Sequence, residues 1–160
     1  MKNNLEWRRG KMEVLQMLYL LGMTLVFSWL IGLERQNIGK AAGISAHVLI
    51  AMSACVAAIL QRNLFLESGS SGENQRLISQ FITGIGVVGA GVILKSEKRI
   101  KGLTTASTLW YCAIIGITIG SGYWVLGLIA GGFSVLFLYI RDIVRKINPF
   151  KKNQETDNDN

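Results

Sequence analysis

The longest uncharged stretch of the chain constrains the fold most. From Gly102 to Ile140 there is no Asp, Glu, Lys or Arg. As one helix, rising 1.5 Å per residue, this stretch would be about 60 Å long, twice the thickness of a membrane's hydrocarbon core. The segment Gly120-Ser121-Gly122 is typical of a turn, and Tyr123 and Trp124 suit the membrane interface. We therefore expect a hairpin of two membrane-spanning helices, over about 103–119 and 123–140.

Three further apolar runs are long enough to span a membrane. They extend from Val14 to Leu33, from Gly43 to about Leu60 and from Leu77 to Leu94. Only 17% of the residues are charged, whereas a soluble domain usually has about 25%. The predicted fold class is therefore all-α: a polytopic membrane protein, a bundle of about five transmembrane helices.

The predicted organisation has three parts. Residues 1–13 form a basic segment with the composition of a helix lying along the interface, and they lack a small-residue cleavage site. Residues 14–141 form the transmembrane domain. Residues 142–160 are basic and then polar, and we expect them to form a disordered tail.

The positive charges predict an orientation. The net charge is +7, and Lys and Arg lie mainly in short segments beside apolar runs, which favours the lipid bilayer over nucleic acid as a partner. Eleven of the 17 Lys and Arg fall on one predicted face. The positive-inside rule places that face in the cytoplasm, with the N-terminus outside and the C-terminus cytoplasmic. Against this, the basic N-terminus would have to cross the membrane.

One group of polar residues is predicted at the cytoplasmic end of the bundle. A charge pair at a helix boundary is often only a solvated helix end, but ionisable groups within a membrane often mark functional sites. The residues expected to gather are Glu34, Arg35, His47, Thr104, Thr105 and Thr108.

A second polar cluster is predicted on the opposite face. Arg76 and Gln80 share one side of a helix, and Glu73 lies one turn before Arg76. An ordinary helix-end salt bridge is the alternative interpretation.

On the cytoplasmic side, a basic loop is expected to meet lipid phosphates or a partner protein; its charges are Lys95, Lys98, Arg99 and Lys101.

A run of small residues lies within the third apolar stretch, at Gly84, Gly86, Gly89, Ala90 and Gly91. Three of its glycines fit GxGxxG, but the strand and helix of a nucleotide-binding motif do not surround them. Small residues in a transmembrane helix allow another helix to approach closely. The run therefore predicts helix packing, without a cofactor.

Catalytic and metal-binding patterns are absent from the sequence. There is one histidine, no HExxH, no Walker A loop and no GxSxG. Cys55 and Cys112 lie in apolar runs without metal-ligand spacing. We therefore expect a protein that is not an enzyme and that has no cofactor or metal site.

The order and spacing of several motifs resemble the MgtC/SapB family over about residues 32–122. The motifs are Gly32-Leu33-Glu34-Arg35, then Arg76-x-x-x-Gln80-x-x-Thr83-Gly84-Ile85-Gly86-x-x-Gly89-Ala90-Gly91, then Lys101-Gly102-Leu103-Thr104-Thr105-Ala106-Ser107-Thr108-Leu109-Trp110. Ser45-Ala46 replaces the Arg-Thr pair usual in the family, and Glu73 replaces an Asp. Past Ile140 the chain resembles the short, SapB-like form, which lacks a soluble C-terminal domain.

The resemblance implies a bacterial inner-membrane protein of magnesium homeostasis and, in pathogens, virulence. It favours a non-enzymatic modulator of a membrane ATPase or ATP synthase, so the expected partner is another membrane protein or a further copy of the chain. The alternative is a transporter, or a transporter subunit, for Mg²⁺ or another small solute. Divalent-cation transport would need several carboxylates at mid-depth, and the apolar runs contain none between their ends.

Overall fold

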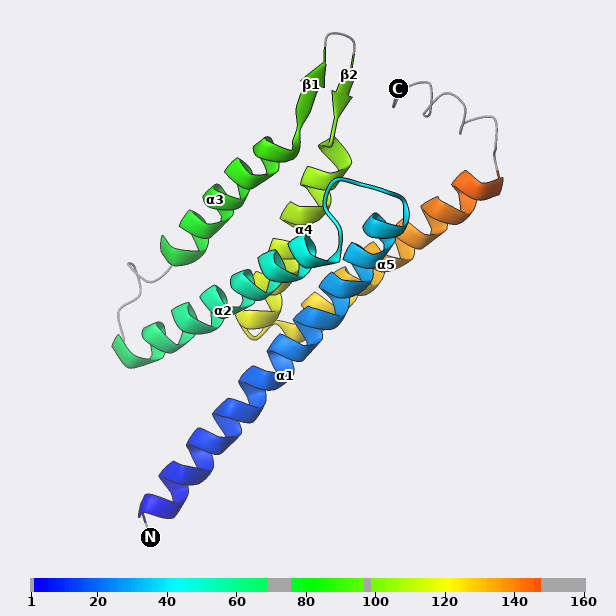
Figure 1. Cartoon of the computed structure of the whole chain (residues 1–160). Coiled ribbons are helices and arrows are strands. Elements are labelled where there is room, and N and C mark those ends of the chain that lie inside the picture. The colour runs from blue at the N-terminus through cyan, green and yellow to red at the C-terminus, as the bar shows by residue number, and fades with distance from the viewer. Residues whose placement is uncertain (1, 69–75, 97–98, 148–160) are drawn as a thin grey trace.

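A computed structural model describes residues 2–68, 76–96 and 99–147, with side chains from 14 to 64, 76 to 93 and 101 to 144. Five helices account for nearly all of this backbone (Figure 1). They are α1 (Lys2–Asn37), α2 (Ile44–Ser68), α3 (Arg76–Val92), α4 (Leu103–Gly120) and α5 (Trp124–Ile147).

The predicted fold class is confirmed. Four helices contain segments long and apolar enough to cross a membrane, namely Val14–Asn37, Ile44–Leu64, Leu103–Gly120 and Trp124–Val144. The fifth, α3, is apolar but has only 17 residues, about 25 Å of helix against a core of about 30 Å.

Three helices are longer than the apolar runs predicted for them. One is α2, which ends at Ser68 and not near Leu60. α1 begins at Lys2, so the basic segment continues into the first spanning helix without a break. Its placement along the interface stays a prediction. α5 continues to Ile147, so residues 142–147 are helical and do not belong to a disordered tail. Basic residues are stabilised at the C-terminal end of a helix dipole, which explains this extension. Residues 148–160 lie outside the described part.

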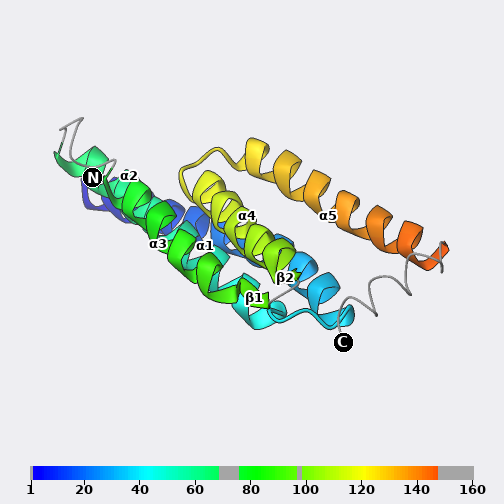
Figure 2. The same ribbon diagram turned by 90° about the horizontal axis from the view of Figure 1, so that it is seen from above.

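α4 is the central helix of the bundle. It packs against α1, α2, α3 and α5, and its contact with α2 is the most extensive between any two helices. Viewed from above, α4 lies between α3 and α5 (Figure 2). α3 packs mainly on α4, so it forms an outer element of the bundle.

Two glycines of α4 allow its close contact with α2. A Cβ at Gly116 would lie 2.2 Å from the carbonyl oxygen of Ala51, and one at Gly120 would lie 2.4 Å from that of Cys55. The two glycines are four residues apart and face one side of α4. This is the small-xxx-small packing of transmembrane helices.

A short β-hairpin joins α3 to α4, where the sequence predicted a basic loop. Strand β1 (Leu94–Ser96) pairs antiparallel with β2 (Arg99–Lys101), so that Leu94 lies opposite Lys101. Gly102 then begins α4 with a φ of +86°, and a Cβ there would lie 2.1 Å from the carbonyl oxygen of Val92. Only glycine fits this junction.

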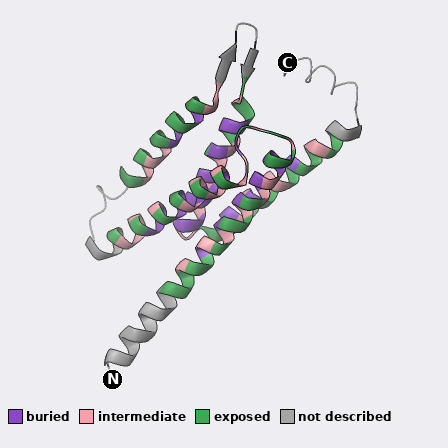
Figure 3. Cartoon of the chain, viewed as in Figure 1, coloured by how far each residue is buried: buried purple, intermediate pink, exposed green. Residues whose placement is uncertain are grey.

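The outer surface is apolar, as expected of a chain that faces lipid. The exposed side chains of the five helices include many large hydrophobic residues, while the buried ones gather along α4 and the faces turned toward it (Figure 3). In water such a surface would be an aggregation hazard, whereas in a bilayer it meets acyl chains.

Candidate functional site

Four helix ends meet at one end of the bundle and bring together the polar residues predicted to gather. They are the C-terminal ends of α1 and α5 and the N-terminal ends of α2 and α4 (Figure 1). The β-hairpin lies at the same end. The candidate site is therefore built by four separate elements of the chain.

Glu34 is the centre of this site. Its side chain is 3% exposed, and its carboxylate accepts hydrogen bonds from two arginines. Arg35 donates through Nε to Oε2 and through Nη2 to Oε1, the latter at 2.6 Å. Arg141 donates through Nη2 to Oε1 at 3.0 Å. The single carboxylate carries one negative charge and the two guanidinium groups carry two positive charges, so the net charge of the three groups is +1.

Arg35 is fully buried, an unusual state for an arginine. Its fork-shaped contact with Glu34 compensates part of the cost of removing the guanidinium from water. Its Nη1 has no hydrogen-bond partner among the described residues. The pair is thus a buried structural element of the site, not the solvated helix end considered as the alternative.

Arg141 was not predicted to belong to the site. It lies on α5, and its side chain is 34% exposed, so it reaches Glu34 from the outer side of the bundle. One sequence feature points to this role: Arg141 directly follows the long uncharged stretch, and it lies on the same predicted face as Glu34.

His47 links α2 to α4. Its Nδ1 lies 2.7 Å from the carbonyl oxygen of Gly43 and donates to it, because a carbonyl can only accept. Its Nε2 lies 3.1 Å from the hydroxyl of Thr108. The side chain is completely buried, and it lies within electrostatic range of Glu34 and Arg35.

The three predicted threonines differ in burial. Thr105 is 2% exposed, and its carbonyl oxygen accepts a hydrogen bond from the Thr108 hydroxyl at 2.9 Å. Thr104 is exposed and lies beside Arg141 in a groove between α4 and α5. Thr105 therefore belongs to the buried interior of the site, and Thr104 to its rim.

The predicted packing residues of α3 lie mostly on its free surface. Gly89 is buried, and a Cβ there would lie 3.7 Å from the Cβ of Ala106 on α4. Gly84, Gly86 and Gly91 would place a Cβ in open space, and Ala90 is exposed. Their predicted role as packing residues would therefore require a second chain.

The second predicted polar cluster lies only partly within the described residues, and it stays a prediction. Arg76 and Gln80 are exposed on α3, and Glu73 lies outside the described residues. Lys98 of the basic loop also lies outside them, whereas Lys95, Arg99 and Lys101 fall in the hairpin strands.

The described residues contain no group of three His, Cys, Asp or Glu side chains placed to hold a metal ion. The carboxylate of Glu34 is already bonded to two arginines. This end of the bundle therefore holds a buried cluster with a net positive charge, next to hydroxyl groups.

Most of the chain is similar to known proteins. The model of the MgtC family matches residues 21–147. "Putative magnesium transporter YhiD" of Escherichia coli (strain K12) is 40% identical over 114 residues, which are 69% of this chain and 53% of that protein. Protein SapB of Bacillus subtilis (strain 168) is 33% identical over 135 residues, covering 81% of this chain and 58% of SapB.

A shorter match is to Protein MgtC of Brucella abortus (strain 2308), 39% identical over 93 residues that cover 58% of this chain and 37% of that protein. The chain thus spans only about half the length of the curated relatives it matches. No solved structure matches the chain.

Proposed function

Because the chain belongs to the MgtC family, we propose that it is a non-enzymatic membrane protein that binds a larger membrane complex, an ATPase or ATP synthase, and modulates it. This modulation would serve adaptation to low magnesium or virulence. The observation that carries the proposal is the small-residue face of α3, which none of the described helices covers.

That face has the geometry of a helix-docking surface. Ser79, Thr83, Gly86 and Ala90 follow one another at spacings of three or four residues, so they lie on one side of α3. All four are exposed. Small side chains allow a neighbouring backbone to approach, and dispersion contacts then stabilise the pair within lipid.

A hollow of about 500 Å³ adjoins this face. It lies between α3 and α4, and its lining includes Gly86, Ala90, Leu103 and Trp110. Trp110 is 44% exposed and Leu103 59% exposed, so large apolar side chains border the small ones. A partner helix would find both close approach and apolar contact there.

The experiment measures ATP-driven proton pumping in inverted bacterial membrane vesicles to which the purified protein is added. We expect the wild type to lower pumping and Gly86→Leu to lose this effect, because the leucine would fill the helix-docking surface. Unchanged pumping with the wild type would contradict the proposal.

Gly22→Leu is the matched control. Gly22 lies on α1, and a Cβ there, as at Gly86, would meet no atom within 4 Å. Both variants should therefore keep the wild-type fold, and Gly22→Leu should still lower pumping. If both variants lose the effect, the helix-docking surface on α3 is not responsible.

Magnesium transport is the second candidate, favoured by the name of the Escherichia coli relative. The measurement is Mg²⁺ entry into proteoliposomes that contain only this protein and an internal indicator. We expect no more entry than into empty liposomes, since the described residues lack a cluster of carboxylates. Entry above that of empty liposomes would support a transporter instead.

A further inference from the structure

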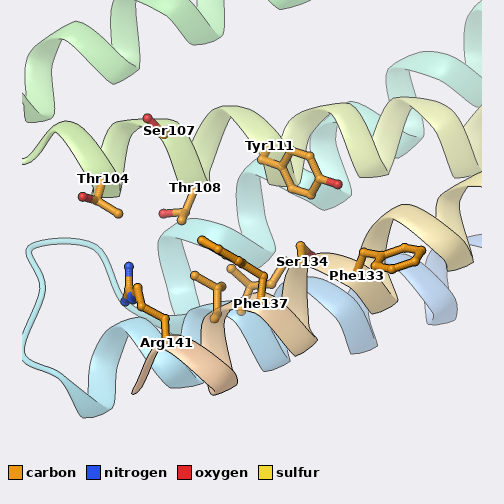
Figure 4. Close-up of a pocket in the computed structure, with 10 residues that line it drawn as sticks. Thr104, Ser107, Thr108, Tyr111, Phe133, Ser134, Phe137 and Arg141 are labelled. Carbon is orange, nitrogen blue, oxygen red and sulfur yellow. The ribbon is translucent and has the colours of Figure 1, made fainter. Parts of the chain in front are cut away.

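A groove between α4 and α5 combines a cationic end with an apolar run. It encloses about 400 Å³, within the range of small-molecule sites. Thr104, Thr108 and Tyr111 line it from α4, and Phe133, Phe137 and Arg141 from α5 (Figure 4). Each set recurs every three or four residues, so the groove follows the helices lengthwise.

The polar end carries an excess of positive charge. Arg141 points toward α4, where Thr104 and Thr108 lie (Figure 4). Glu34 accepts hydrogen bonds from Arg141 and also from the buried Arg35, so the three linked side chains have a formal charge of +1. Asp142, the next residue of α5, does not line the groove. An anionic group of the ligand would balance this charge.

The apolar part extends from that end toward the middle of the membrane. From Arg141 to Phe133 is eight residues of helix, a rise of about 12 Å. Tyr111 closes the inner part by donating a hydrogen bond to the carbonyl oxygen of Ala130 on α5 at 3.2 Å. Phe133 is 69% exposed and Phe137 65% exposed, so the groove is open to the surrounding lipid.

We propose that this groove binds one anionic phospholipid, with its phosphate at Arg141 and an acyl chain along Phe137 and Phe133. The polar end lies where α5 leaves its apolar span, which ends at Val144, and therefore at the level of lipid headgroups. A chain entering from the bilayer follows the groove inward without leaving the hydrocarbon region.

Charge complementarity selects the anionic lipid over a zwitterionic one. An arginine donates charge-assisted hydrogen bonds to a phosphate oxygen, and basic pockets between transmembrane helices bind anionic headgroups. A zwitterionic lipid brings its own positive charge to the same place. A soluble phosphate would meet Arg141 but leave the apolar run uncovered.

The experiment is native mass spectrometry of the purified protein in detergent, titrated with phosphatidylglycerol or with phosphatidylcholine of the same acyl chains. We expect one phosphatidylglycerol per chain, bound about tenfold more tightly than phosphatidylcholine, which corresponds to about 1.4 kcal/mol. Equal binding of the two lipids by the wild type would overturn the proposal.

Three variants locate the site. Arg141→Gln should bind phosphatidylglycerol only as well as phosphatidylcholine. Ser134→Phe should weaken the binding of both lipids, because Ser134 lines the groove and the new ring would fill it. Lys40→Gln removes one charge from the α1–α2 loop, outside the groove lining, and should leave the preference unchanged.

Two further outcomes decide against the proposal. If Ser134→Phe has the melting temperature of the wild type and binds the lipid equally well, the lipid binds elsewhere. This test does not depend on whether Arg141→Gln folds. If inorganic phosphate displaces the bound phosphatidylglycerol, the polar end binds a soluble anion in preference to a lipid. We expect no displacement, since phosphate lacks the acyl chain.

Discussion

At the scale of single residues, the strongest constraint is the charge balance at Glu34. Its carboxylate is buried and accepts hydrogen bonds from Arg35 and Arg141. Removing one member of a buried ionic group usually costs about 3–5 kcal/mol, because the remaining charges lose their compensation. The three members are not equivalent, since Arg35 is fully buried and Arg141 is one-third exposed.

Glu34→Gln should destabilise the protein more than Arg141→Gln does. The first change leaves two guanidinium groups without a carboxylate, and we expect a loss of about 3–5 kcal/mol in the free energy of unfolding. The second leaves the Glu34–Arg35 pair neutral and intact, and we expect a loss of about 1 kcal/mol. Denaturant unfolding in detergent, followed by tryptophan fluorescence, measures both. Equal stability of Glu34→Gln and the wild type would mean that the ionic group does not hold these helices together.

At the scale of helices, the structure separates two kinds of glycine. Gly116 and Gly120 of α4 face the backbone of α2, where a Cβ would collide with carbonyl oxygens. Gly84, Gly86 and Gly91 of α3 face open space. The glycines of α4 therefore allow packing within the chain. Those of α3 leave a surface that another chain can contact.

Gly116→Ala should destabilise the protein, although alanine favours the helical backbone. Its Cβ would be 2.2 Å from the carbonyl oxygen of Ala51, and separating α4 from α2 should cost about 1–3 kcal/mol. Gly132→Ala on α5 is the control, because a Cβ there meets nothing within 4 Å. We expect it to be neutral or to gain up to about 1 kcal/mol. Thermal unfolding of both variants in one detergent tests this, and similar melting temperatures would contradict the α2–α4 packing.

At the scale of the whole molecule, the membrane topology depends on whether the short helix α3 crosses the membrane. If it does, the α1–α2 loop and the β-hairpin lie on one side, and the α4–α5 turn lies on the other. If it does not, the hairpin changes side. The structure places the loop and the hairpin at the same end of the bundle (Figure 1).

Cysteine labelling should show this arrangement. With Lys40→Cys, Lys101→Cys and Ser121→Cys as separate variants, an impermeant maleimide applied to whole cells should label Ser121→Cys alone. Lys40→Cys and Lys101→Cys should react only in inverted vesicles, which would also establish the predicted orientation. The native Cys55 and Cys112 are buried and should remain unlabelled. Opposite labelling of Lys40→Cys and Lys101→Cys would mean that α3 does not cross.

The sequence was sufficient for the membrane class, for the approximate helices and for part of the site. Apolar runs bounded by charges predict spanning helices because a bilayer cannot satisfy exposed backbone groups. Glu34, Arg35 and His47 were found because each ends or interrupts such a run. The ends of α1, α2 and α5 were placed too early, since a helix continues into water as long as its backbone bonds are satisfied there.

What only the tertiary structure decided is which distant residues meet. Arg141 bonds Glu34 across 107 positions of the chain, and no local pattern encodes that contact. Gly116 packs within the chain and Gly86 does not, although both are glycines in apolar helices. The hydropathy of a segment depends only on its own residues, so the sequence is enough to predict which segments enter the membrane. Which face of a helix meets another helix depends on the shapes of both surfaces at once, and that is settled only when the bundle assembles.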